Sequence, residues 1–320
     1  MNWLKVPKKV YFKTGCYPVA LKELDEVYGF GKAFIISDAN LYTTGVVEPI
    51  KNYLKERGLA VCEFFTLSET PCFADARSGL QKMLEFEPDV IVGMGDGAVM
   101  SMAKIMLLLY ENPDIDLDKV AKKFTKTSVS EAEFPTIGAK AKLVLITTTA
   151  GSGMECSPYA VVANDQGKKV VISSFKLVPE IAVIDGDLAI QNTPEQNKEA
   201  AMQTIANAAR AYASPSATDY MKGFARDAVR VVFENLPTVL EKGPRAPRER
   251  ENLINAAAIA GMAIGSAVDT IDPDAGAYPS ANDKNAKKVE KERLTELAKA
   301  AGVADDFDSW IAACEKLAAL

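Results

Sequence analysis

A short apolar segment followed by closely spaced glycines constrains this chain more than any other feature. Residues 89–92 are apolar and β-branched, as in a strand of a parallel sheet that is covered on both faces. Gly93, Gly95 and Gly97 then permit a tight turn, and the pattern becomes helical from Ala98. A helix N-terminus behind such a turn suits a phosphate. The same glycines would also serve a plain strand-to-helix turn, so both interpretations stay open at this point.

A second glycine turn favours the ligand-binding interpretation. Residues 142–146 predict another short buried strand, which ends in the segment Thr147–Glu155 with three threonines and two glycines. Open α/β sheets bind their ligands at the carboxyl ends of parallel strands.

Strands and helices of about 12 residues alternate through the first part of the chain. The predicted strands are 10–12, 32–37, 61–66, 89–92, 142–146 and 181–184, and the predicted helices are 17–28, 43–57, 74–86 and the segment from 98. This alternation predicts a parallel, doubly wound, Rossmann-like sheet. Residues 159–172 predict a hairpin, whereas 114–141 carry no core pattern and are expected to form a helix and a loop over the sheet.

The strands stop near residue 190. Helices are predicted at 198–213, 216–236, 248–269, 284–301 and 307–318, and the third of these is rich in alanine and glycine. Small residues let helices approach closely in a bundle. The sequence therefore predicts an α/β domain at 1–189, an all-helical domain at 190–320 and a cleft between them.

The 320 residues include no histidine, which excludes Ser-His and Cys-His mechanisms and every imidazole metal ligand. The net charge is 37 − 43 = −6, and neither a basic block nor a long apolar run suggests nucleic acid or a membrane. Five scattered cysteines lack zinc spacing and favour reduced thiols, and the first residues lack the apolar core of a signal peptide. We therefore expect a cytoplasmic protein.

Both glycine turns resemble those of the iron-containing, group III alcohol dehydrogenases. That family has a Gly-Gly-Gly-Ser-x-x-Asp-x-x-Lys turn, matched by Gly95 to Lys104, and a Thr-Thr-x-Gly-(Thr/Ser)-Gly-x-Glu turn, matched by Thr148 to Glu155. The opening segment 7–15 looks most like the alcohol dehydrogenase half of bifunctional aldehyde–alcohol dehydrogenases. The resemblance runs from about residue 5 to about residue 272. It implies the dehydroquinate synthase-like fold of that family and a homo-oligomer.

The resemblance also implies one Fe²⁺ or Zn²⁺ in the cleft, held by an Asp and a His at positions i and i+4 of the first C-terminal helix and by two later histidines. Those first two positions hold Gln203 and Asn207, and neutral amides are poor ligands for these ions. The third position falls at about Pro273, and the stretch carrying the fourth is expected to be missing after about Tyr278. The acidic loop 269–274 could hold a hard cation loosely, but a loop or capping role is expected. The sequence predicts no metal.

The family's cofactor is a nicotinamide dinucleotide. The cofactor positions that the resemblance implies are Asp38, Gly95, Asp96, Gly97, Ala98, Ser101, Thr148, Thr149, Ser152 and Lys169. Asp38 at a strand end would bind ribose hydroxyls and favour NAD over NADP, or would cap a helix instead. Asp96 replaces a glycine of the family, and a carboxylate about 4 Å from a pyrophosphate oxygen costs on the order of 4 kcal/mol at an effective dielectric near 20. Ala98 and Ser101 replace the family's Ser and Asp. We therefore expect weak NAD binding.

Three hypotheses about function follow. The first is a descendant of an NAD-linked alcohol–aldehyde oxidoreductase that lacks the metal and the activity, and keeps residual nucleotide binding or an assembly role. The second is an active metal-independent NAD(P)-dependent reductase, for which Tyr159, Tyr212 and Tyr278 are the candidate cleft phenols. The third is a structural or engineered scaffold without a ligand.

Overall fold

The computed structural model describes residues 4–189, 192–271 and 288–320. Its main sheet has six strands: β1 (Lys9–Phe12), β2 (Lys32–Ile36), β3 (Ala60–Phe64), β4 (Val90–Gly95), β5 (Lys142–Thr147) and β8 (Ile181–Ile184). The order is β1-β8-β5-β4-β2-β3, and every neighbouring pair is parallel. The predicted doubly wound parallel sheet is therefore confirmed.

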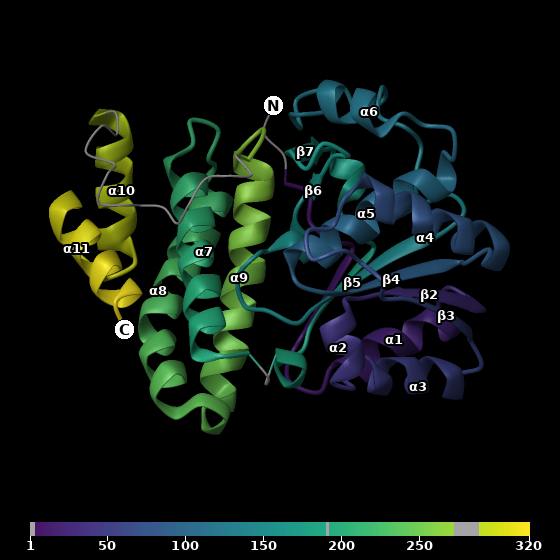
Figure 1. Cartoon of the computed structure of the whole chain (residues 1–320). Coiled ribbons are helices and arrows are strands. Elements are labelled where there is room, and N and C mark those ends of the chain that lie inside the picture. The colour runs from purple at the N-terminus through teal and green to yellow at the C-terminus, as the bar shows by residue number, and fades with distance from the viewer. Residues whose placement is uncertain (1–3, 190–191, 272–287) are drawn as a thin grey trace.

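Helices cover both faces of this sheet (Figure 1). The helices of this part are α1 (Tyr17–Glu26), α2 (Ala39–Thr43), α3 (Glu48–Glu56), α4 (Phe73–Phe86), α5 (Gly97–Glu111) and α6 (Leu117–Lys123). Alternate strand residues face opposite layers. Ile35 and Val92 pack in the apolar cluster that contains α1 and α3, whereas Phe34 and Ile91 pack with α4 and α5.

The helix predicted at 43–57 is confirmed in part as α3, but its predicted start is wrong, because residue 43 belongs to the separate short helix α2. The break lies at Gly45, which has a φ of +78° and so takes the left-handed conformation that ends α2. Pro49 stands at the start of α3, where its missing N–H has no helical partner to lose.

The helix and loop expected at 114–141 are observed as α6 and the segment that follows it, but the expectation that this stretch carries no core pattern is wrong. Leu117 and Val120 of α6 are buried, as are Phe124 and Phe134 in the loop that follows. Leu117, Val120 and Phe124 follow the i, i+3, i+7 spacing of one helix face, so the sequence does carry a helical core pattern here. Strands β6 (Tyr159–Ala163) and β7 (Lys169–Ser173) form the predicted antiparallel hairpin.

The rest of the described chain is helical and lies beside the sheet, with α9 nearest to it (Figure 1). The helices are α7 (Pro194–Ala213), α8 (Asp219–Lys242), α9 (Pro247–Ala267), α10 (Lys288–Ala300) and α11 (Phe307–Ala318). Helix α8 continues through Pro237 to Lys242, beyond the predicted end at 236. One apolar cluster joins Ile184 of β8 to Ala201 of α7, across the domain boundary that the sequence predicts at 189/190.

Candidate nucleotide cleft and the expected metal-ligand positions

The two glycine turns lie against each other at the carboxyl edge of the sheet. The Thr148 N–H donates a hydrogen bond to the Gly95 carbonyl oxygen at 3.1 Å. A Cβ atom on Gly97 would lie only 2.7 Å from the Ser152 Cβ, so the second turn packs directly on the first. The structure thus brings together the two turns that the sequence singles out.

The glycines of the second turn also seat the helical part. A Cβ on Gly151 would lie 2.4 Å from the Ala200 Cα of α7. Gly153 has a φ of +64°, and a Cβ there would lie 2.6 Å from the Gly261 Cα of α9. The backbone of the second turn therefore packs directly against the backbone of α9. Position 153 requires glycine for two reasons, its left-handed conformation and this close approach.

Asp96 is the N-cap of α5. Its Oδ1 accepts hydrogen bonds from the Ala98 N–H at 2.9 Å and the Val99 N–H at 3.0 Å. These are the donors that a helix N-terminus would otherwise offer to a phosphate. From sequence alone, Asp96 is expected to oppose a phosphate only through charge repulsion. The structure adds that its carboxylate also occupies two donors, and an Asp directly before a helical pattern is the signal that could have revealed this.

Asp38 lies at the carboxyl end of β2 and caps α2, with its Oδ1 accepting from the Leu41 N–H at 2.8 Å. The capping alternative is therefore observed. Because β2 pairs with β4 in parallel register, Asp38 stands at the same edge of the sheet as Asp96. The predicted contact with ribose hydroxyls stays a prediction.

A cavity of about 210 Å³ opens beside the first turn, and its walls include Gly97, Ala98, Ser101 and Lys169. The structure thus brings these four candidate cofactor residues to one site. The Ser101 hydroxyl donates to the Gly97 carbonyl oxygen at 2.7 Å. Lys169 comes from the exposed start of β7. One wall of this cavity is therefore the first glycine turn, and the other is the hairpin.

The threonines of the second turn are held by main-chain contacts. Thr148 is buried, and its carbonyl oxygen accepts from the Asn192 side chain at 3.2 Å. The Thr149 carbonyl oxygen accepts from the Thr147 hydroxyl at 2.8 Å. These bonds fix the turn, and a role of either residue toward a cofactor stays a prediction.

Lys104, the last residue of the first family motif, is not a solvated helix lysine. It is fully buried and donates to the carbonyl oxygens of Met154, Ser157 and Tyr159 at 2.7–2.8 Å. Burial lowers the pKa of Lys104 to about 7, and the nearby Glu155 carboxylate opposes that shift. Nearby, burial raises the pKa of Glu155 to about 7.

Gln203 and Asn207, which the resemblance assigns to the first two metal-ligand positions, lie on one face of α7 and line a small cavity of about 110 Å³. The Gln203 Nε2 donates to the Asn207 Oδ1 at 3.0 Å, and the Asn207 Nδ2 donates to the Ser152 carbonyl oxygen at 3.2 Å. The amides therefore bond to each other and to the second glycine turn. Two neutral amides that use their polar atoms in this way do not fit an iron or zinc centre.

Within residues 4–189, 192–271 and 288–320, no group of three His, Cys, Asp or Glu side chains is placed to hold a metal ion. Pro273, Tyr278 and residues 272–274 of the acidic loop lie outside the described residues. All five cysteines are free thiols.

The two candidate phenols within the described residues, Tyr159 and Tyr212, are both buried and therefore inaccessible to a substrate. Tyr159 is 1% exposed, and its hydroxyl donates to the main-chain carbonyl oxygens of Ile264 and Val268. Burial raises its pKa far above that of a free phenol. Tyr212 is also buried, and burial raises its pKa as well.

Comparison with known proteins agrees with this geometry. Residues 7–186 match the family "iron-containing alcohol dehydrogenase", and residues 199–273 match the C-terminal part of the same family. The chain belongs to the iron-containing alcohol dehydrogenase family. Among curated relatives, the bifunctional aldehyde-alcohol dehydrogenase AdhE of Escherichia coli strain K12 is 34% identical over 270 residues. That match covers 83% of this chain but 30% of the relative, so the chain spans about a third of such bifunctional proteins.

Solved structures of this family share the fold. The iron-containing alcohol dehydrogenase from Thermococcus thioreducens superposes with a TM-score of 0.82 at 21% identity, covering 99% of this chain and 85% of the other. Sulfoacetaldehyde reductase from Bifidobacterium kashiwanohense in complex with NAD⁺ gives 0.79 at 19% identity, covering 99% and 85%. Through the described part of the chain, no helix is both long and apolar enough to cross a membrane.

Proposed function

We propose that this chain is a member of the family that has lost the metal centre and, with it, NAD-linked alcohol–aldehyde oxidoreduction. It keeps the fold and a weak affinity for NAD. The observation that carries this proposal is the bonded pair Gln203–Asn207, which stands at the first two ligand positions. Side chains that satisfy each other leave no donor set for Fe²⁺ or Zn²⁺.

The loss of activity follows from the chemistry of hydride transfer. Oxidation of an alcohol passes through a developing alkoxide, and one lost stabiliser of such an oxyanion costs about 10²–10³ in rate. Amide groups supply no comparable positive charge. A phenol could act instead, but the Tyr159 hydroxyl is already committed to two main-chain oxygens. This weakens the alternative of a metal-independent reductase.

Residual nucleotide binding is supported by the adjacent turns and by the cavity between Ser101 and Lys169. A neighbour of the same fold carries NAD⁺ in its crystal structure. Affinity is expected to be weak, because Asp96 adds negative charge and occupies two N–H groups of α5. An assembly role in a homo-oligomer belongs to the same proposal. Sedimentation of the purified protein measures it, and a monomer at micromolar concentration would contradict it.

The experiment combines metal analysis with a turnover assay. The purified protein is expected to contain far less than one iron or zinc per chain after mild dialysis. NADH formation from ethanol, butanol and 1,2-propanediol should stay at background, with and without added Fe²⁺ or Zn²⁺. An active iron-dependent alcohol dehydrogenase assayed in parallel is the positive control. About one tightly held metal per chain would overturn the proposal. Turnover that survives a strong chelator would also overturn it, in favour of the metal-independent reductase.

A further inference from the structure

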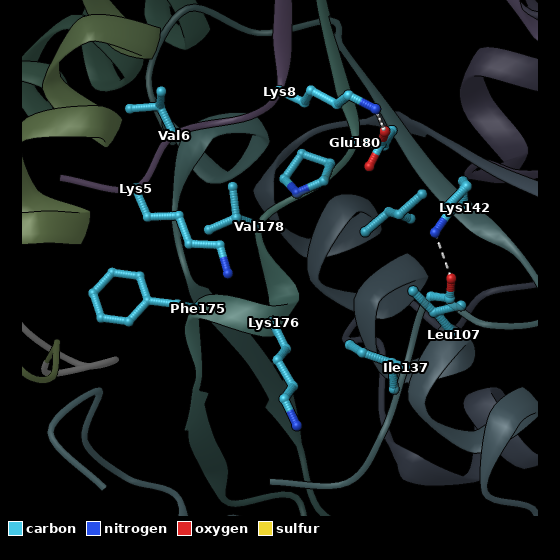
Figure 2. A pocket seen from close by; sticks show the side chains of 13 residues that line it. Lys5, Val6, Lys8, Leu107, Ile137, Lys142, Phe175, Lys176, Val178 and Glu180 are labelled. Atoms are coloured by element: carbon cyan, nitrogen blue, oxygen red, sulfur yellow. Dashed lines mark hydrogen bonds and ion pairs between the residues drawn. The ribbon is translucent and has the colours of Figure 1, made fainter. Parts of the chain in front are cut away.

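Four lysines surround a cavity of about 310 Å³ at the edge of the sheet opposite the glycine turns (Figure 2). Lys142 opens β5, and Lys176 lies just before β8. Lys5 and Lys8 belong to the segment that leads into β1. The fold therefore brings three segments that are distant in sequence to one cationic cavity, which neither the family resemblance nor the proposed function uses.

The charges in this cavity are only partly compensated. Lys8 pairs with Glu180 at 2.8 Å, and Lys5 lies 3.7 Å from Glu131 outside the cavity wall. The other two lysines meet main-chain oxygens instead. Lys142 donates to the Gly138 carbonyl oxygen at 2.6 Å, which Figure 2 shows as a dashed line.

Lys176 donates in the same way to the Phe134 carbonyl oxygen, at 2.8 Å. A carbonyl oxygen orients an ammonium group without cancelling its charge. Lys142 and Lys176 are both half-buried, so solvent screens them less than it screens a surface lysine. With four lysines and Glu180 in the wall, and Glu131 beside Lys5, the formal charge is 4 − 2 = +2, in a protein whose net charge is −6.

Apolar side chains fill the wall between the charges. Phe175 and Val178 line the cavity on the side of Lys5, and Leu107 and Ile137 line it near Lys142 (Figure 2). A site for a bare inorganic ion would not need such a wall. Apolar contacts near cationic groups suit a ligand that carries both an apolar body and negative charge.

We propose that this cavity binds a small organic phosphate, a phosphate monoester with a compact apolar group. Lysine ammoniums bind phosphate as point charges, and several of them can approach a tetrahedral phosphate from different directions. A volume of about 310 Å³ corresponds to roughly ten water-sized groups at about 30 Å³ each. Phenyl phosphate has this size and combines both properties.

The test is calorimetric titration of phenyl phosphate at pH 8 and low salt. The double variant Lys142→Gln/Lys176→Gln removes two charges but keeps two amide donors for the carbonyl oxygens. The matched control, Lys55→Gln/Lys119→Gln, removes the same charge from exposed positions outside the cavity wall. The double variant is expected to bind at least tenfold more weakly than the native protein, and the control within twofold. Thermal unfolding confirms that both fold, and each single variant should lose about threefold.

Three results would overturn the proposal. One is the absence of phenyl phosphate binding to the native protein at millimolar concentration. Another is an equal loss of affinity in the double variant and the control, since this would reflect net charge alone. The third is inorganic phosphate binding as tightly as phenyl phosphate, because the apolar wall would then contribute nothing. Phenol, which lacks the charge, should not bind measurably.

Discussion

Replacing Asp96 by glycine should strengthen NADH binding. In the native protein the Asp96 carboxylate accepts from the Ala98 and Val99 N–H groups, so the substitution frees both donors and removes one negative charge. At about 4 Å, two unit charges repel by roughly 1 kcal/mol in bulk water and roughly 4 kcal/mol at an effective dielectric of 20. Because the Asp96 side chain is exposed, the lower value is the better guide. An affinity gain of about fivefold to tenfold is therefore expected.

The variant Asp96→Asn separates the two effects. Asparagine caps helices as well as aspartate does, so this variant keeps an acceptor for the two N–H groups but removes the charge. Glycine at an N-cap costs only a few tenths of a kcal/mol of stability relative to a good cap, so both proteins should fold. Calorimetric titration with NADH should rank the proteins Asp96→Gly first, Asp96→Asn second and the native protein last. Equal dissociation constants for all three would refute this account of the turn.

Three other outcomes are expected. Lys104→Met should lower the free energy of unfolding in urea by about 3 kcal/mol or more, because three buried carbonyl oxygens lose their donor; a loss below about 1 kcal/mol would contradict that. Burial raises the pKa of Glu155 to about 7 in the folded protein, above its unfolded value, so native stability should fall as pH rises from about 4.5 to 7. Relative to the native protein, the free energy of unfolding of Glu155→Gln should therefore rise by about 1–3 kcal/mol between pH 4.5 and pH 7. A difference in unfolding free energy that does not change with pH would contradict this. Gln203→Asp/Asn207→His should bind zinc only weakly in a competition assay with a chromogenic chelator, since two ligands are still lacking; nanomolar affinity would contradict the count of lost ligands.

The sheet could be predicted because each of its strands has a recognisable local sequence pattern. Residues 143–146 are continuously apolar, and a strand buried on both faces can be recognised from such a run without knowledge of its partner strands. Helix breaks were harder. Gly45 interrupts the segment 43–57, but a single glycine inside an otherwise helical pattern is often tolerated. Conversely, Pro237 does not end α8, because packing against α7 and α9 outweighs one lost helical hydrogen bond.

The candidate site could be located from sequence, but its contacts could not. The two turns were identified from glycine and threonine spacing, whereas their mutual contact through Gly97 and Ser152 depends on sheet order. The burial of Lys104 and the three acceptors of its ammonium could not be predicted from sequence either. Its neighbours on α5 give no hint that the acceptors for its ammonium lie 50–55 residues further along the chain. Buried polar partners that are distant in sequence leave no local pattern.

The contact between Gly153 and Gly261 has a consequence for how such motifs persist. A side chain at either position would force the sheet and α9 apart, so selection for a stable fold alone would keep both glycines. Purifying selection on this motif would then continue after its ligand had been abandoned. In descendants of such dehydrogenases, retained glycines of this motif therefore indicate only that the fold is retained. Neighbouring residues such as Asp96 are the better indicators of whether a ligand is still bound.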